Sequence, residues 1–156
     1  MRFPQVSGSN LEEKDYNIPS DLEGDLNLLI IPFKRWQQSM VDSWSEFLTQ
    51  ITKKLDQINF KFYELPTLAK GYDLMSFLIN GGMRAGIPDK SVRERTITLY
   101  LNKSKFKKSL NIENENTIYL FLIKRTGKIL WNASGKFNRK FAEEMLQILL
   151  KNSNLN

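Results

Sequence analysis

Two absences limit the chemistry that the side chains of this chain could perform. Its 156 residues include no cysteine and no histidine. Without cysteine there is no disulfide, no thiol nucleophile and no thiolate ligand for an iron–sulfur cluster. Without histidine the chain lacks the commonest general base and metal ligand, and a Ser-His-Asp triad is excluded. We therefore expect no catalytic residue, no metal site and no cofactor.

The first group of candidate binding residues follows an apolar run at Leu26–Phe33. The group consists of Arg35, Trp36, Gln37 and Gln38. A run this apolar is typical of a strand buried on both faces of a parallel sheet, and in open α/β sheets ligands bind beyond the carboxyl ends of such strands. One interpretation is a recognition patch of an aromatic ring and amides. The alternative is that Trp36 is the first buried residue of the following helix.

The second group of candidates is basic and lies in the stretch "MRAGIPDKSVRER". It consists of Arg84, Arg93 and Arg95. Guanidinium groups bind carboxylates and phosphates in a bidentate manner, so one interpretation is a flexible loop that holds an anion. The alternative is a solvated loop in which Asp89 and Glu94 pair with these arginines.

The elements that must position these residues alternate between strands and helices. Apolar residues recur with a helical period from Trp36 to about Ile58, with Trp44 among those expected in the core. The other expected helices are Lys70–Met83, a short one capped by Ser104, and Asn138–Leu150. The other expected strands are Phe60–Leu65, Thr96–Leu101, Thr117–Ile123 and Lys128–Ala133, the last two joined by a turn at Gly127.

This order predicts one α/β domain over residues 1–156, with a loop-rich N-terminal segment at residues 1–26. The expected architecture is a three-layer sandwich. Its mixed, mostly parallel sheet would be completed by a C-terminal β-hairpin and a final helix.

The net charge of +6 is unevenly spread, with the basic excess in Lys90–Lys108 and from Lys124 onward. It indicates either a surface for an acidic protein, an anionic membrane or nucleic acid, or simply solvated lysine-rich faces. Phe106 is the only aromatic residue among the lysines of residues 103–108, so base stacking has little support and we expect no nucleic-acid partner. The N-terminus has no signal-like apolar run, and no run is long enough to span a bilayer. We expect a cytoplasmic protein, or an organelle matrix protein if a transit peptide was removed.

Three stretches, in this order, resemble a thioredoxin-like fold of the peroxiredoxin type. They are "FPQVSGSNLEEKDYNIPSDLEGDLNLLIIPF", "TLYLNKSKFKKSLNI" and "TIYLFLIKRTGKILWNASG". A narrower resemblance is to the mitochondrial ATP synthase assembly factors of thioredoxin-like fold. It rests on the last of these stretches and on the helix start "QSMVDSW". This resemblance implies a chaperone of a membrane subunit rather than a redox enzyme.

The departures from the thioredoxin pattern concern its redox machinery. The reactive thiol would fall near Trp36–Met40, where this chain has "WQQSM", and Ser39 lacks the low pKa and the redox chemistry of a thiol. The proline expected before the strand that faces the active site is replaced by Thr117, which follows Asn116.

We therefore predict a redox-inactive thioredoxin-fold binding protein with a protein partner. It would act as an assembly chaperone for a membrane complex such as ATP synthase. A first alternative is a non-thiol enzyme or small-molecule binder, with Asp42, Tyr72 and Arg84 as the nearest acid–base candidates. A second is a nucleic-acid or membrane-surface binder that uses the basic surface.

Overall fold

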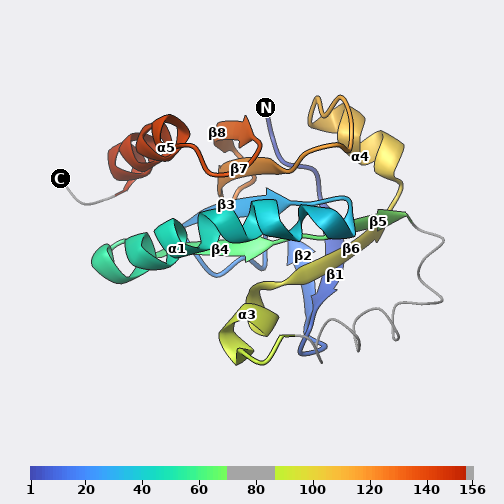
Figure 1. The fold of residues 1–156 in the computed structure, drawn as a ribbon, viewed down its shortest axis with the longest axis horizontal. Coiled ribbons are helices and arrows are strands. Elements are labelled where there is room, and N and C mark those ends of the chain that lie inside the picture. Colours follow the sequence, from blue (N-terminus) through green and yellow to red (C-terminus); the bar gives the residue numbers. More distant parts are fainter. Residues whose placement is uncertain (70–86, 154–156) are drawn as a thin grey trace.

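Two mixed four-stranded sheets organise the chain in the computed structural model, which describes residues 1–69 and 87–153 (Figure 1). The strands of the first sheet, in spatial order, are β4 (Phe60–Glu64), β3 (Leu26–Ile31), β7 (Tyr119–Lys124) and β8 (Ile129–Ser134). The strands of the second are β2 (Asp15–Ile18), β1 (Val6–Asn10), β6 (Ile97–Leu101) and β5 (Thr67–Ala69). An isolated parallel bridge between Glu64 and Thr96 links the two sheets.

The first sheet is buried on both faces, which explains why every residue of β3 is buried. On one face, β3 packs against α1 (Gln38–Lys54) and α5 (Arg139–Asn152), with Trp44 and Met145 fully buried in this layer. On the other face, Leu29 and Ile31 pack against the second sheet and α4 (Lys103–Ser109). The other helices of the described residues are η1 (Arg35–Gln37), a single 3₁₀ turn, and α3 (Lys90–Arg95).

The predicted thioredoxin-like α/β class with its C-terminal hairpin and helix is confirmed, but the strand directions differ in part. Only β3–β4 and β5–β6 are parallel among the paired strands of the described residues. The pairs β3–β7, β7–β8, β1–β2 and β1–β6 are antiparallel. An apolar run indicates that a strand is buried on both faces of its sheet, but not which way the strand runs. An antiparallel strand that is covered on both faces is as apolar as a parallel one.

The N-terminal segment that we expected to be loop-rich contains the antiparallel pair β1–β2. Asn10 holds its turn, because its Oδ1 accepts hydrogen bonds from the backbone N–H groups of Glu12 and Lys14, both at 2.9 Å. The alternation in β2 buries Tyr16 and Ile18 against the core. These strands are short and largely polar, so their pairing depends on the tertiary fold.

Three helix predictions also change. The helix expected from Trp36 begins at Gln38. The stretch expected to be a basic loop contains α3. The side chain of its N-cap residue, Asp89, accepts a hydrogen bond from the backbone N–H of Ser91. Asn102 caps α4 in place of Ser104. The helix expected at Lys70–Met83 lies outside the described residues. Among the helices of residues 1–69 and 87–153, none has the length and apolar character needed to cross a bilayer.

Candidate functional site

The turn between β3 and α1 is held by the buried side chain of Gln37. Its Oε1 accepts hydrogen bonds from the backbone N–H groups of Phe33 at 2.8 Å and Lys34 at 3.1 Å. Its Nε2 donates to the carbonyl oxygen of Glu115 at 2.6 Å. Gln37 therefore ties the end of β3 to the loop that precedes β7. Because the side chain is 0% exposed, the prediction that Gln37 contacts a partner is corrected to a role in positioning the turn.

Trp36 points outward from the same turn and is 61% exposed. Consecutive residues of a 3₁₀ turn lie about 120° apart, so an inward Gln37 leaves its neighbour facing solvent. The interpretation of Trp36 as the first buried residue of the helix is therefore wrong. The buried residues of the helix lie further along α1 and include Trp44, which is fully buried. The Nε1 of Trp44 donates a hydrogen bond to the carbonyl oxygen of Gly135 at 3.0 Å.

A carboxylate that the sequence analysis did not single out lies beside this turn. Glu115 is 15% exposed and faces the ammonium groups of Lys34 at 3.4 Å, Lys103 at 2.9 Å and Lys107 at 2.8 Å. Burial alone would raise the pKa of Glu115, but the hydrogen bonds and charges of Lys107 and Lys103 outweigh it and lower the pKa to about 2. The sequence signal was the pair of lysines four residues apart on α4.

A second carboxylate, Glu64, lies at the carboxyl end of β4 and was also missed. It is 8% exposed, and burial raises its pKa to about 7, with a further contribution from the negative charge of Asp42. A hydrogen bond from Gln38 and the charge of Arg95 oppose this rise. Gln38 and Arg95, which were predicted as members of two separate groups, therefore both interact with Glu64. Gln38 also donates a hydrogen bond to Asp42 Oδ1 at 3.0 Å.

The arginines of the basic stretch have different environments. Arg95 places its guanidinium carbon 4.4 Å from the centroid of the Phe62 ring. Arg93 Nε donates to Glu12 Oε1 at 2.7 Å, and its Nη1 donates to the carbonyl oxygens of Ile87 and Pro88, both at 2.8 Å. Arg93 therefore fixes the approach to α3 against the β1–β2 turn, and we assign it a structural role. Arg84, like Tyr72, lies outside the described residues.

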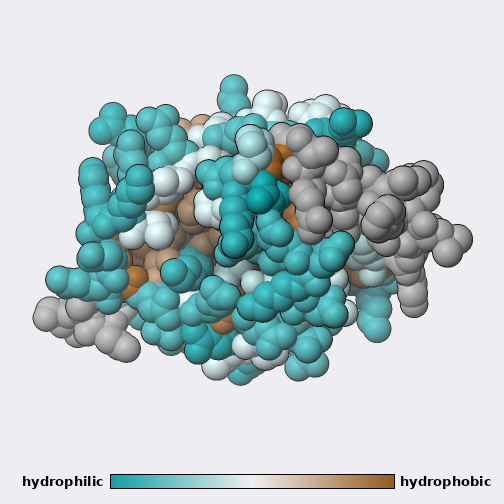
Figure 2. All heavy atoms as spheres, turned by 90° about the horizontal axis from the view of Figure 1, so that it is seen from below, coloured by the Kyte–Doolittle hydropathy of each residue, from teal (hydrophilic) through white to brown (hydrophobic). Residues whose placement is uncertain are grey.

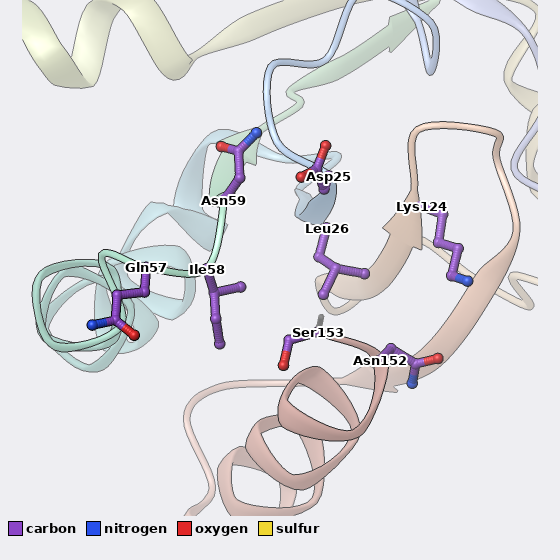
Figure 3. Close-up of a pocket in the computed structure, with 8 residues that line it drawn as sticks. All are labelled: Asp25, Leu26, Gln57, Ile58, Asn59, Lys124, Asn152 and Ser153. Carbon is purple, nitrogen blue, oxygen red and sulfur yellow. The ribbon is translucent and has the colours of Figure 1, made fainter. Parts of the chain in front are cut away.

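A pocket of about 300 Å³ lies at the other end of the strands of the first sheet, away from the β3–α1 turn (Figure 3). Leu26 of β3 and Asn59, just before β4, mark its position at the amino ends of these strands. Its other lining residues are Asp25, Gln57, Ile58, Lys124, Asn152 and Ser153. The pocket contains none of the residues predicted from sequence, and its polar side chains do not converge on one point (Figure 3). We therefore place the candidate site at the β3–α1 turn.

The exposed side chains around this turn and the partly buried Arg95 together form one surface. We define the junction surface as Arg35, Trp36, Gln38, Asp42 and Arg95. It combines an aromatic ring, an amide and charges of both signs, but no nucleophile activated by a base. The face seen from below in Figure 2 is mostly hydrophilic; its broadest apolar area lies left of centre, with smaller apolar spots elsewhere.

Comparison with known proteins decides the family. The family model described as "ATP10 protein" matches residues 1–151. This chain belongs to the ATP10 protein family. The family consists of mitochondrial ATP synthase assembly factors, so membership confirms the narrower resemblance found in the sequence and implies a role in ATP synthase assembly. A search of curated protein sequences gave no match to this chain.

Solved structures with a similar fold include several thioredoxin-like proteins. ScoI of Arabidopsis thaliana, solved with copper bound, has a TM-score of 0.63 at 9% identity, covering 97% of this chain and 99% of its own. The exposed lipoprotein thioredoxin Etrx1 of Streptococcus pneumoniae has a TM-score of 0.60 at 14% identity, with 95% and 99% covered. BsSco, a member of the Sco family of cytochrome c oxidase assembly proteins, has 0.57 at 12%, with 96% and 94% covered. At these identities the likeness shows the fold alone.

Proposed function

We propose that this ATP10 family protein is a redox-inactive assembly chaperone that binds a subunit of ATP synthase through the junction surface. Its place of action would be the mitochondrial matrix. The absence of cysteine from the sequence supports the redox-inactive part, because thiol–disulfide exchange requires a thiolate. The observation that carries the binding part is the exposure of Trp36 on a turn that Gln37 holds in place.

The physics of interfaces favours Trp36 as the centre of binding. Tryptophan is enriched among the few interface residues that contribute most of the binding free energy. A ring that is 61% exposed in the free protein has a large area still to bury. Because the hydrogen bonds of Gln37 already fix the backbone of this turn, little conformational entropy remains to be lost on binding.

The alternative that this protein is an enzyme is supported by the raised pKa of Glu64 but, among the described residues, not by a pocket that this carboxyl group could face. Glu64 has the raised pKa that a general acid needs near neutral pH. Its side chain, however, is buried between α1 and α3 and does not line the pocket of Figure 3. We therefore assign Glu64 to the electrostatics of the junction surface rather than to a reaction.

The experiment replaces Trp36 in cells that lack their own ATP10 family protein. We expect Trp36→Ala to leave the protein folded and to weaken partner binding by about 30-fold, the equivalent of ~2 kcal/mol for loss of a central tryptophan. The measurement is the amount of assembled ATP synthase on native gels, together with co-purification of its subunits. Leu150→Ala is the matched control, because Leu150 is 42% exposed but lies on α5. Normal assembly and co-purification with Trp36→Ala would contradict the proposal.

A further inference from the structure

A second surface of this protein is defined by lysines rather than by Trp36. We call it the lysine surface, and it consists of Lys34, Lys103, Lys105, Lys107 and Lys108. The neighbouring acidic residues are Glu113 and Glu115. Five positive charges against two negative ones leave a surplus of three, which is half of the net charge of +6 of the whole chain. The charge is therefore concentrated at one corner of the molecule.

Glu115 gathers this surface from two distant parts of the chain. Its carboxylate binds Lys34 from the β3–α1 turn as well as Lys103 and Lys107 from α4. One carboxylate cannot neutralise three ammonium groups, so a net positive charge remains around it. Lys105 and Lys108 add to it, because both are exposed and neither forms an ion pair with another residue of the described ranges.

The lysines of α4 face solvent because the helix is anchored by its one aromatic residue. Phe106 is 4% exposed, and its ring packs edge-on against Phe3 with centroids 5.9 Å apart. The helix stands at the upper right of the view in Figure 1. With Phe106 facing the core, Lys105 and Lys108 remain exposed on this helix.

The residue types favour a lipid bilayer over other polyanions. The lysine surface has no arginine, so it lacks the planar fork that recognises single carboxylates or phosphates in a bidentate manner. With Phe106 buried, it also lacks an aromatic platform for stacking nucleic-acid bases. Flexible ammonium groups suit the diffuse negative charge of anionic headgroups, and clusters of this size are typical of surfaces that bind such lipids.

We propose that the lysine surface binds anionic phospholipid bilayers peripherally, without insertion of α4. This goes beyond the proposed function, which concerns a protein partner and depends on the junction surface. The two surfaces share no residue, so each can be removed without removing the other.

The test uses the full chain and vesicles of phosphatidylcholine with or without phosphatidylglycerol. We expect co-sedimentation only with phosphatidylglycerol present, and weaker binding as the salt concentration rises. Lys105→Glu combined with Lys108→Glu should weaken binding at least about 30-fold. Lys53→Glu combined with Lys54→Glu is the matched control, because it makes the same charge change at exposed lysines in the last turn of α1 and should have little effect.

Several outcomes would overturn the proposal. They are equal binding to vesicles without phosphatidylglycerol, no binding to either vesicle, and equal losses in the two double variants, which would show that only net charge matters. Tighter, lysine-dependent binding to single-stranded RNA would assign the surface to nucleic acid instead. The Trp36→Ala variant should bind vesicles like the wild-type protein, because Trp36 is not part of the lysine surface. If vesicle binding fails, the test of the proposed assembly function with Trp36→Ala is therefore unaffected.

Discussion

Glu64→Gln should stabilise the protein by about 3 kcal/mol above about pH 8 and have little effect below about pH 4.5. The carboxyl group of Glu64 has a pKa of about 7 in the folded protein, against 4.5 for an ordinary glutamate. Burial is the main cause, and Asp42 adds to it. The glutamine side chain keeps the size of the buried group but cannot ionise, so the variant avoids the cost of burying a charge.

The direction of this pH dependence follows from which state loses its proton first. Below about pH 4.5 Glu64 is protonated in both states, so it contributes nothing to the slope. Between about pH 4.5 and 7 the unfolded chain releases the proton while the folded protein keeps it, so the free energy of unfolding falls as the pH rises. This destabilisation is complete once the pH exceeds the folded pKa.

Urea unfolding at a series of pH values measures this effect. The wild-type and Glu64→Gln curves should converge in acid and separate as the pH rises through 7. Glu46→Gln is the control, because it makes the same chemical change at an exposed glutamate of α1 and should not reproduce the separation expected for Glu64→Gln. A constant difference between Glu64→Gln and wild type at every pH would show that the carboxyl group of Glu64 does not ionise late in the folded protein.

Gln37→Ala should lower the free energy of unfolding by about 3 kcal/mol, because it leaves buried polar groups without partners. The lost contacts are the two hydrogen bonds from the backbone N–H groups of Phe33 and Lys34 and the bond to the carbonyl oxygen of Glu115. The substitution also removes the buried amide that ties the β3–α1 turn to the loop before β7, and leaves only the more exposed contact between Lys34 and Glu115 among the described links between the two segments. The exposed ring of Trp36 should therefore become more mobile.

Chemical denaturation and tryptophan fluorescence test this second prediction together. Gln50→Ala provides the comparison, since Gln50 is an exposed glutamine of α1 and its loss should change stability by less than about 0.5 kcal/mol. If Gln37→Ala were no more destabilising than Gln50→Ala, the turn would not depend on the buried amide.

The elements with strong periodicity were predictable from sequence. The apolar residues of α1 recur at helical spacing, and Val41, Trp44, Leu48 and Ile51 are indeed its buried residues. The apolar strands β3 and β7 were also found, as was the turn at Gly127, which has a φ of +97°. In each case the local pattern and the tertiary structure agree, so the pattern alone was sufficient.

The site was less predictable because its features arise from tertiary contacts. Trp36 and Gln37 are neighbours in sequence with opposite exposures, and a single 3₁₀ turn has no period from which to infer which one is buried. Glu64 is exposed or buried according to how α1 and α3 pack over the end of β4, which no residue of the strand itself specifies. Arg93 resembled a free anion ligand in the sequence, but its partner Glu12 is 81 residues away.

A thioredoxin-like scaffold without a thiol can still use the position at which related folds do chemistry. In this chain the strand–helix turn carries an exposed tryptophan on a backbone fixed by a buried glutamine. The fold thereby presents an exposed aromatic ring at the carboxyl end of β3, and the proposed function takes this ring as the recognition residue.

Site-specific crosslinking at Trp36 tests that claim most directly. A photoreactive benzoylphenylalanine would replace Trp36 or, as a control, Leu150, in the chain expressed in mitochondria. We predict that the probe at position 36 crosslinks to a subunit of ATP synthase during assembly, while the probe at position 150 does not. Two results would contradict recognition by the junction surface. One is a crosslink to an ATP synthase subunit from position 150 but not from position 36. The other is no crosslink from either position in cells that assemble the enzyme normally.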